Sequence, residues 1–139
     1  MLSYRYFSEG LVRLQDAYDQ DLSNDYVLSG LCFKVSRQFD LSWKLLKRLL
    51  EFEGDSTAAS GSPRDIIKAA FRIYDFLDKD VWLSLLRDRN TIVHIYDPER
   101  AAELVERILH QYLPAFRLLD EGLTSRYGPM LLLPDDQAR

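Results

Sequence analysis

Residues 25–54, DYVLSGLCFKVSRQFDLSWKLLKRLLEFEG, carry the pattern that decides the fold. Apolar residues recur there at close to every 3.5 positions, which is the spacing of a helix that buries one stripe along its length. The stripe consists of Leu28, Leu31, Val35, Phe39, Trp43, Leu46 and Leu50. Such a stripe must be covered by other helices, and Gly54 is well placed to end this one.

The rest of the chain shows helical periodicity as well. The predicted helices cover residues 4–18, 28–50, 63–74, 81–96 and 98–119. Ser62 followed by Pro63 is a typical helix start, Asp97–Pro98 ends one helix and opens the next, and Pro114 predicts a kink in the last. We therefore predict one all-α domain, an antiparallel bundle of about five helices over residues 1–126, followed by a loosely ordered tail over 127–139.

Composition narrows the class of protein. The chain has 139 residues, of which 47% are hydrophobic and 29% charged, as in an ordinary soluble domain. Its single cysteine, Cys32, cannot form a disulfide within the chain, which favours a reducing cytoplasm. The start, MLSYRYFSEG, does not resemble a signal peptide, and no apolar run approaches the ~18 residues of a membrane span, so we expect no membrane association. The net charge of −4 argues against a surface coated in positive charge but leaves room for a small basic cleft.

Polar side chains interrupt the apolar face of the helix predicted over residues 81–96. That face consists of Trp82, Leu85, Leu86 and Val93. Arg89, seven residues after Trp82, lies on the same face. A guanidinium is rarely buried without a partner, so Arg89 is expected where another surface packs.

Asn90 and His94 are four residues apart and share a neighbouring strip of this helix. Arg89 and His94 are five residues apart, about 140° around an ideal helix, so they do not point the same way. They could meet if the helix unwinds near Asp97–Pro98. They could also meet if a second copy of the helix lies across a two-fold axis, as in an isologous dimer.

The motifs for familiar chemistries are missing from the sequence. It has no P-loop, GxGxxG, CxxC or HExxH, and two histidines with one cysteine make a zinc site improbable, so we expect neither a metal nor a cofactor. What remains is histidine as a general acid or base and arginine as a phosphate ligand. Cleavage of RNA by its own 2′-hydroxyl needs these two functions and no metal. The residues permit this chemistry without requiring it.

Arg89–Asn90, His94 and Tyr96 resemble the R-x4-H-x-Y motif of HEPN-domain proteins. Three longer blocks, RQFDLSWKLLKRLLEFEG (37–54), SPRDIIKAAF (62–71) and VWLSLLRDRNTIVHIYD (81–97), are similar to the nucleotidyltransferase substrate-binding protein family, close to the HepT-like toxins. The resemblance implies a helical bundle that forms a homodimer and is encoded beside a minimal nucleotidyltransferase.

The resemblance also implies roles for single residues. In the toxin members the dimer is a metal-independent ribonuclease with the motif arginine and histidine at the subunit interface, and a nucleotidyltransferase antitoxin transfers AMP to the motif tyrosine. Carried over, Arg89 binds the scissile phosphate of RNA, His94 is the general acid and base, and Tyr96 accepts AMP. Asn90 and Asp88 are supporting residues, Asn90 by positioning the helix end or the histidine.

The chain departs from the family pattern at two places. Ile92 and Val93 replace residues that are often small and polar in the substrate-binding branch, which favours the toxin form. Arg87 stands where an acidic residue is more usual. It either adds positive charge for RNA or pairs with Asp88 or Asp80.

Plainer interpretations stay open for each of these groups. Arg89 and His94 could be interface residues satisfied by carboxylates, and Tyr96 could only cap the bundle. The basic cluster, which either contacts RNA or is a solvated helix face, consists of Lys44, Lys47 and Arg48. For the whole chain the hypotheses are a cytoplasmic ribonuclease toxin, a non-catalytic subunit that presents substrate to a nucleotidyltransferase, and a plain dimerisation protein. The complete motif favours the first over the second, and both over the third.

Overall fold

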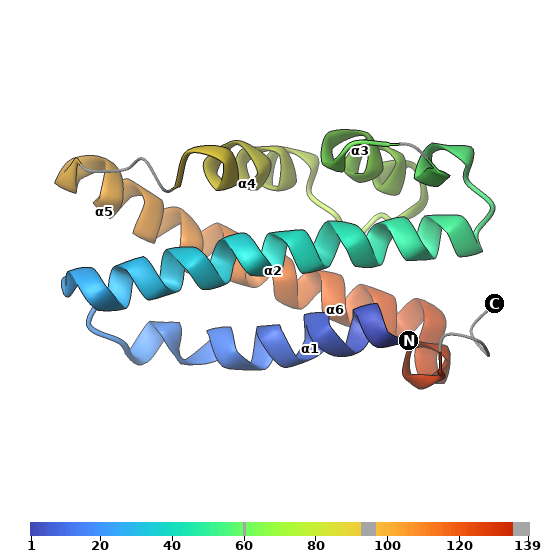
Figure 1. Ribbon diagram of the computed structural model, residues 1–139, viewed down its shortest axis with the longest axis horizontal. Helices are drawn as coiled ribbons and strands as arrows, with labels where there is room; N and C mark the ends of the chain where they lie inside the picture. Colours follow the sequence, from blue (N-terminus) through green and yellow to red (C-terminus); the bar gives the residue numbers. More distant parts are fainter. Residues whose placement is uncertain (60, 93–96, 135–139) are drawn as a thin grey trace.

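The computed structural model describes residues 1–59, 61–92 and 97–134 and is an all-α bundle (Figure 1). Its α-helices are α1 (Leu2–Leu14), α2 (Asp25–Phe52), α3 (Pro63–Ile73), α4 (Lys79–Thr91), α5 (Pro98–Arg107) and α6 (Leu113–Tyr127). Short 3-10 helices cover Gln15–Asp19, Ser56–Ala59 and Gly128–Leu132. A π-helical turn, Ile108–Tyr112, joins α5 to α6 into one continuous rod, and the described residues contain no strand. The predicted fold class is confirmed.

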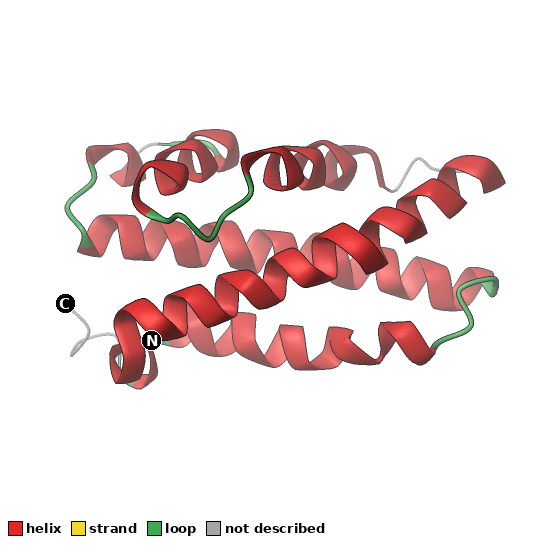
Figure 2. Ribbon diagram, turned by 180° about the vertical axis from the view of Figure 1, so that it is seen from behind, coloured by secondary structure: helices red, strands yellow, loops and turns green. Residues whose placement is uncertain are grey.

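The rods alternate in direction along the chain. Helix α2 runs antiparallel to α1, and α3 and α4 follow one another back along α2 as one interrupted rod (Figure 1). The continuous rod of α5 and α6 crosses behind α2 in this view and lies in front when the molecule is turned around (Figure 2). In the described part of the chain, no helix is long and apolar enough to span a membrane.

The helix ends follow the signals in the sequence. Ser62 caps α3 by accepting a hydrogen bond from the Asp65 N–H at 3.2 Å, and the Asp65 carboxylate accepts one from the Ser62 N–H at 3.3 Å. Helix α2 ends before Gly54, whose φ of 79° favours glycine. The Asp55 N–H then donates to the Leu50 carbonyl at 2.9 Å, which completes a Schellman motif.

The buried face of α2 is wider than the predicted stripe. Five predicted core residues are buried, namely Leu31, Val35, Phe39, Leu46 and Leu50. Leu28 and Trp43 are only half-buried, whereas Gln38 and Ser42 are buried because their polar groups have partners. Gln38 Nε2 donates to the Phe7 carbonyl at 2.8 Å, and Ser42 Oγ donates to the Gln38 carbonyl at 2.7 Å. Neighbours on both sides of α2 explain the difference, since α1 covers one flank and α3 and α4 the other.

Trp82 anchors α4 in the core. Its side chain is 1% exposed, and its ring lies 6.5 Å from the ring of Phe39 on α2 and 5.8 Å from the ring of Phe116 on α6. Three helices therefore meet at one aromatic cluster, which fixes how α4 is placed against its neighbours.

The last rod passes through Pro114 by way of the π-helical turn. Pro114 has no N–H, so it cannot donate to the carbonyl of His110 as a residue of a regular α-helix would. Just before it, the Leu113 N–H donates to the carbonyl of Ile108, five residues back. The interruption expected at Pro114 thus coincides with a widened turn, and the helix continues on both sides of it.

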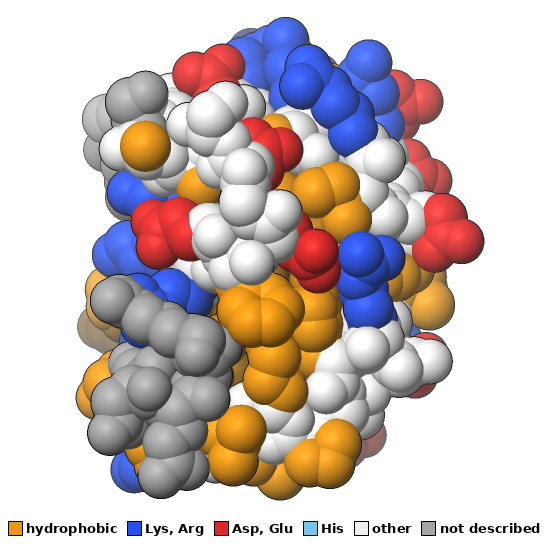
Figure 3. Space-filling model, turned by 90° about the vertical axis from the view of Figure 1, so that its right-hand side faces the viewer, with side chains coloured by type: hydrophobic (Ala, Val, Ile, Leu, Met, Phe, Trp, Pro, Cys, Tyr) orange, Lys and Arg blue, Asp and Glu red, His pale blue; other side chains and the backbone are white. Residues whose placement is uncertain are grey.

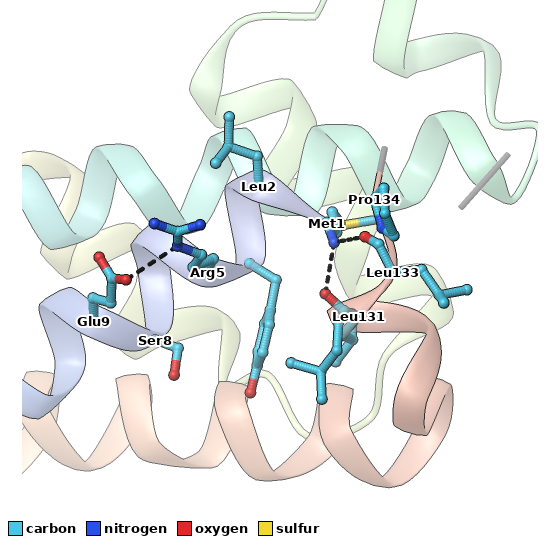
Figure 4. Close-up of a pocket in the computed structure, with 10 residues that line it drawn as sticks. Met1, Leu2, Arg5, Ser8, Glu9, Leu131, Leu133 and Pro134 are labelled. Carbon is cyan, nitrogen blue, oxygen red and sulfur yellow. Dashed lines mark hydrogen bonds and ion pairs between the residues drawn. The ribbon is translucent and has the colours of Figure 1, made fainter. Parts of the chain in front are cut away.

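The segment after α6 is packed where it is described. We expected a loosely ordered tail beyond residue 126, whereas Gly128–Leu132 forms a 3-10 helix with Leu131 only 1% exposed. The Met1 amino group donates to the carbonyls of Leu131, at 2.9 Å, and Leu133 (Figure 4). A pocket of about 440 Å³ lies beside these contacts, between the start of α1 and this 3-10 helix.

The end of the bundle where α2 and α6 finish shows charged side chains around an apolar patch (Figure 3). Tyr127 donates a hydrogen bond from its hydroxyl to Glu53 Oε1 at 2.7 Å and shares another, of 2.6 Å, with the Tyr74 hydroxyl. The Arg126 guanidinium lies 5.1 Å from the ring centre of Tyr74. These contacts join the C-terminal ends of α2, α3 and α6.

Candidate functional site

Arg89, in the last turn of α4, finds its partner on α2. Its Nη2 lies 2.8 Å from Oδ1 of Asp40, and the two side chains are 34% and 32% exposed. The same carboxylate oxygen accepts a hydrogen bond from Trp43 Nε1 at 3.2 Å. The guanidinium of Arg89 therefore has a carboxylate partner on another helix of the same chain.

Two further contacts hold the guanidinium of Arg89. Nη1 donates to Oδ1 of Asn90 at 3.0 Å, and the guanidinium carbon lies 5.9 Å from the ring centre of Phe39. An arginine side chain has five N–H donors, and the described contacts of Arg89 leave some of them for a further acceptor. The arrangement is suited to bind an anion such as a phosphate at the surface of the bundle.

Asp88 faces the opposite way, into the protein. It is 6% exposed, and its Oδ2 accepts hydrogen bonds from Arg107 Nε at 2.7 Å and from the hydroxyl of Tyr112. Burial and the hydrogen bond to Asp88 raise the pKa of Tyr112 to about 12, and the bond to Asp88 raises the pKa of Arg107. Asp88 therefore ties α4 to α5 and to the π-helical turn, directly beside Arg89 in the sequence.

Arg87 is exposed and contacts its own helix. Its Nη2 donates to Oγ of Ser84 at 3.2 Å, and that oxygen also shares a hydrogen bond of 2.8 Å with the Tyr112 hydroxyl. In the described structure its hydrogen bond goes to Ser84, and Asp88, one of the two carboxylates considered as its partner, accepts a hydrogen bond from Arg107. The charge of Arg87 therefore faces solvent.

The basic cluster lies along α2, one and two turns beyond Asp40. Lys44 Nζ lies 6.0 Å from the ring centre of Trp43, and Arg48 lies 4.0 Å from Glu51. Lys47 is half-buried. These three cations follow Asp40, the partner of Arg89, along α2.

His94 and Tyr96 lie outside the described residues, as does Val93. The residues on either side of this segment, Ile92 and Asp97, are described. Ile92 is 7% exposed at the end of α4, and Asp97 caps α5 by accepting a hydrogen bond from the Glu99 N–H at 3.0 Å. Their roles therefore rest on the sequence motif.

Sequence reasoning missed three of the residues that organise this region, namely Asp40, Arg107 and Tyr112. Asp40 could have been found, because it is the only acidic residue between positions 26 and 50 and lies within one of the blocks that carry the resemblance. Tyr112 lies within the helix predicted over residues 98–119, where its spacing from Ile108 and Phe116 indicates a core position and not the hydrogen bond that its hydroxyl donates to Asp88.

No metal site is evident in residues 1–59, 61–92 and 97–134, where no group of three or more His, Cys, Asp and Glu side chains comes together. The pocket of about 440 Å³ is lined by the start of α1 and the segment after α6, and Arg89 does not line it. The described chemistry at Arg89 is therefore that of a fixed, partly exposed cation.

Comparison with known proteins places the chain in one family. No curated protein matches the sequence. The family model described as "Nucleotidyltransferase substrate binding protein like" matches residues 2–125, which include all six α-helices except the last residues of α6. The resemblance seen in the sequence blocks is thereby confirmed. The chain belongs to the nucleotidyltransferase substrate-binding protein-like family.

Proposed function

We propose that two copies of this chain form a metal-independent endoribonuclease of the HEPN type, the toxin of a toxin–antitoxin pair. Arg89 would bind the scissile phosphate, and His94 would transfer protons. The observation that supports this role is the state of Arg89, which is one-third exposed and fixed by Asp40 and Asn90. A cation held in one orientation at a surface is prepared to bind a phosphate with little loss of side-chain entropy.

The reaction needs only these two kinds of group. The 2′-oxygen of RNA attacks the adjacent phosphorus, the bond from phosphorus to the 5′-oxygen breaks, and a 2′,3′-cyclic phosphate and a 5′-hydroxyl result. One imidazole takes the proton of the 2′-hydroxyl and another gives a proton to the leaving 5′-oxygen. Arg89 stabilises the negative charge that develops on the phosphorane. Two copies of His94, one from each subunit, satisfy both proton transfers.

The neighbouring cations supply affinity for RNA. Arg87 is exposed on α4, two residues before Arg89. Lys44, Lys47 and Arg48 lie on α2, one and two turns after Asp40. Such side chains bind the phosphate backbone without reading the bases, so the binding falls as salt is added. A chain with a net charge of −4 would rely on this local cluster rather than on its overall charge.

Tyr96 would be the site of neutralisation by a cognate minimal nucleotidyltransferase. Its phenolic oxygen attacks the α-phosphorus of ATP, pyrophosphate leaves, and the phenol proton is released. The bound AMP adds a phosphodiester two residues after His94. That negative charge competes with RNA for the same cations, which gives the modification a physical route to inhibition.

A second function has support from one contact. Arg89 is already paired with the carboxylate of Asp40 at 2.8 Å, which lowers its attraction for a second anion. The chain could instead be a non-catalytic subunit that presents substrate to a nucleotidyltransferase, as the family description suggests. In that case the motif would hold protein or nucleotide groups without cleaving RNA.

The deciding experiment is cleavage of total cellular RNA by the purified protein in EDTA. Arg89→Ala and His94→Ala should each remove the cleavage, while Arg126→Ala, an equal change of charge at the far end of the bundle, should keep it. Mass spectrometry of the intact protein must first show that Tyr96 is unmodified. Equal cleavage by wild type and both motif variants, or none by the unmodified wild type, would exclude the ribonuclease and favour the substrate-binding subunit.

A further inference from the structure

Helix α3 carries three cations on one face. Arg64, Lys68 and Arg72 are spaced four residues apart, so they form one stripe along the helix, here called the cationic stripe. All three side chains are exposed, while the opposite face of α3 is buried in the core. In Figure 3, lysine and arginine side chains gather at the top of the molecule, on the side where α3 lies in Figure 1. The cationic stripe therefore faces solvent.

The cationic stripe has no counter-charge from its own chain. In the part of the chain that the structure describes, no carboxylate forms an ion pair with any of its three side chains. Asp65, its acidic neighbour on α3, accepts a hydrogen bond from the Ser62 N–H in the capping box. Arg89 and Arg107, by contrast, each have a carboxylate partner. The stripe thus keeps its positive charge for an acceptor from outside the chain.

These charges do not help α3 to fold. Like charges four residues apart on a helix repel each other, and the stripe contains two such pairs, Arg64 with Lys68 and Lys68 with Arg72. Arg64 also lies in the first turn of α3, where the positive end of the helix macrodipole disfavours a cation. The chain has 22 acidic residues against 18 basic ones, yet no acidic residue interrupts the stripe. Side chains that oppose local stability are expected where they serve a function.

The length of the cationic stripe fits a chain of anions. Positions 64 and 72 are eight residues apart, which is about 12 Å along the helix axis. One phosphate or carboxylate group can contact two neighbouring cations but cannot reach from one end of the stripe to the other. A polymer with a negative charge on each unit can contact all three cations at once. The stripe is therefore matched to a polyanion and not to a single small anion.

The surroundings of the cationic stripe favour nucleic acid over an acidic protein. The centre of a protein–protein interface is typically apolar and carries aromatic anchors. The large hydrophobic side chains that are exposed in the described chain all lie outside α3. A phosphate backbone, in contrast, is bound by exposed arginine and lysine side chains without an apolar centre. Only the second kind of partner finds what it needs on this face.

We propose that the cationic stripe binds the phosphate backbone of an RNA strand, as a second contact surface on a different helix from Arg89. The identity of the polymer as RNA rests on the proposed function, whereas the contact with a phosphate backbone rests on the stripe. Helices α3 and α4 follow one another as one interrupted rod (Figure 1), so a strand that lies along this rod runs from the stripe towards the last turn of α4, which holds Arg89. The contacts are to phosphates, so the binding is independent of base sequence.

The test is the binding of a fluorescent 2′-O-methyl oligouridylate, measured by anisotropy over a series of salt concentrations. Its 2′-oxygens are methylated, so they cannot attack the phosphates, and binding is measured without cleavage. The stripe variant combines Arg64→Gln, Lys68→Gln and Arg72→Gln. At ~0.1 M salt its Kd should rise at least about tenfold, and its plot of log affinity against log salt should be shallower by about 2, as expected for three lost phosphate contacts.

The matched control combines Arg5→Gln, Arg13→Gln and Lys34→Gln. It makes the same change of net charge at exposed positions of α1 and the first half of α2. Its Kd should stay within about twofold of the wild-type value, because salt screens exposed charges that do not contact the strand. Both variants should keep the wild-type thermal midpoint, since every replaced side chain is exposed and glutamine is as good a helix former as arginine or lysine.

Equal Kd and salt dependence in the stripe variant and the wild type would overturn the proposal. Equal losses in the stripe variant and the control would overturn it as well, because net charge alone would then explain the binding. If polyglutamate displaced the oligonucleotide from the wild type at an equal concentration of charges, the stripe would belong to an acidic protein. A wild type that bound the oligonucleotide through the stripe but left RNA uncut would end the ribonuclease proposal and support this one, so the two proposals fail separately.

Discussion

Asp40 and Arg89, 49 residues apart in the sequence, join the middle of α2 to the last turn of α4 through one ion pair of 2.8 Å. Both side chains are about one-third exposed, so the pair contributes little to stability, about 1 kcal/mol or less. Its larger effect is on orientation. Asp40 holds the guanidinium of Arg89 in one orientation and accepts a hydrogen bond from the Trp43 indole N–H. Its negative charge also offsets part of the positive charge of Arg89.

Asp40→Asn should therefore change cleavage of RNA in two ways. The amide removes one negative charge, so RNA binds more tightly and KM falls. It also loosens the hold on Arg89, so kcat falls by about 3- to 10-fold. Steady-state kinetics on a defined RNA would separate the two effects. Asp120→Asn is the matched control, because Asp120 accepts a hydrogen bond from Tyr4 at 2.9 Å on another side of the bundle, and its kinetics should equal those of the wild type.

Asp88→Asn should destabilise the fold. Asp88 is nearly buried and accepts hydrogen bonds from both Arg107 and Tyr112, so the amide leaves the guanidinium without its counter-charge. We expect a loss of about 2–3 kcal/mol in the free energy of unfolding, measured by urea denaturation. Asp80→Asn, an exposed position in the first turn of α4, should change it by less than about 0.5 kcal/mol. Equal losses of unfolding free energy in both variants would show that the hydrogen bonds of Asp88 stabilise the fold no more than an exposed aspartate does.

Stability should fall with rising pH in the alkaline range, in part through Tyr112. Burial and Asp88 raise its folded-state pKa from 10.0 to about 12. Between these values the unfolded chain has released the proton that the folded protein keeps, so the free energy of unfolding falls as pH rises from 10 to about 12, by about 2–3 kcal/mol at most.

Tyr112→Phe isolates that contribution, because burial also raises the pKa of Tyr127 and Tyr74. Urea denaturation across this pH range should give a shallower decline for Tyr112→Phe than for the wild type. Tyr6→Phe, at a side chain 44% exposed, provides the comparison for simply losing a phenol. Parallel curves for Tyr112→Phe and wild type would contradict the assignment.

Gly122→Ala should destabilise the bundle for a steric reason. A Cβ atom at Gly122 would lie 2.3 Å from the ring of Phe76, which stacks on Tyr74 with 5.2 Å between ring centres. The ring must move, and we expect a cost of about 1–3 kcal/mol in thermal or urea unfolding. Ser125→Ala, an exposed position on the same helix, should be nearly neutral. No loss in Gly122→Ala would mean that Phe76 moves freely.

Tyr96→Phe should abolish modification by the cognate nucleotidyltransferase. Incubation of the wild type with that enzyme and ATP should raise its intact mass by whole AMP units, and the variant should gain none, because phenylalanine has no nucleophilic oxygen. Tyr18→Phe, which removes an exposed phenol elsewhere, should be modified like the wild type. An increase in mass that survives in Tyr96→Phe would place the acceptor at another residue.

The sequence was sufficient to predict the helices because their signals are local. The capping box at Ser62 and the glycine end at Gly54 depend on neighbours a few residues away, and both were found where the pattern put them. Trp43 shows that the spacing of apolar residues alone does not predict which of them are buried. It has the right spacing for the core, but its indole N–H donates to Asp40, so it lies half-buried at the edge of the site.

Partners of the site residues come from distant segments, which a periodic pattern does not reveal. Arg89 was predicted to need a packing surface, but its partner Asp40 lies on another helix, and nothing local connects them. The supporting role of Asp88 stays a prediction. Of the partners weighed for it, Arg87 is not the one that it bonds. It accepts hydrogen bonds from Arg107 and Tyr112, because its place on α4 turns it towards α5 rather than towards solvent.

The widened turn at Ile108–Tyr112 keeps the buried residues of α5 and of α6 on the same side of the last rod, facing the core. The buried residues around it, Leu104, Ile108, Tyr112 and Phe116, are spaced by four, and each step of four drifts about 40° around a regular α-helix. Three steps would carry Phe116 about 120° away from Leu104. The extra residue held in the π turn absorbs this drift, so both ends of the rod face the same core. If the turn closed into a regular α-helix with all its residues kept, one half of the rod would rotate against the other and the Tyr112 hydroxyl would move away from Asp88.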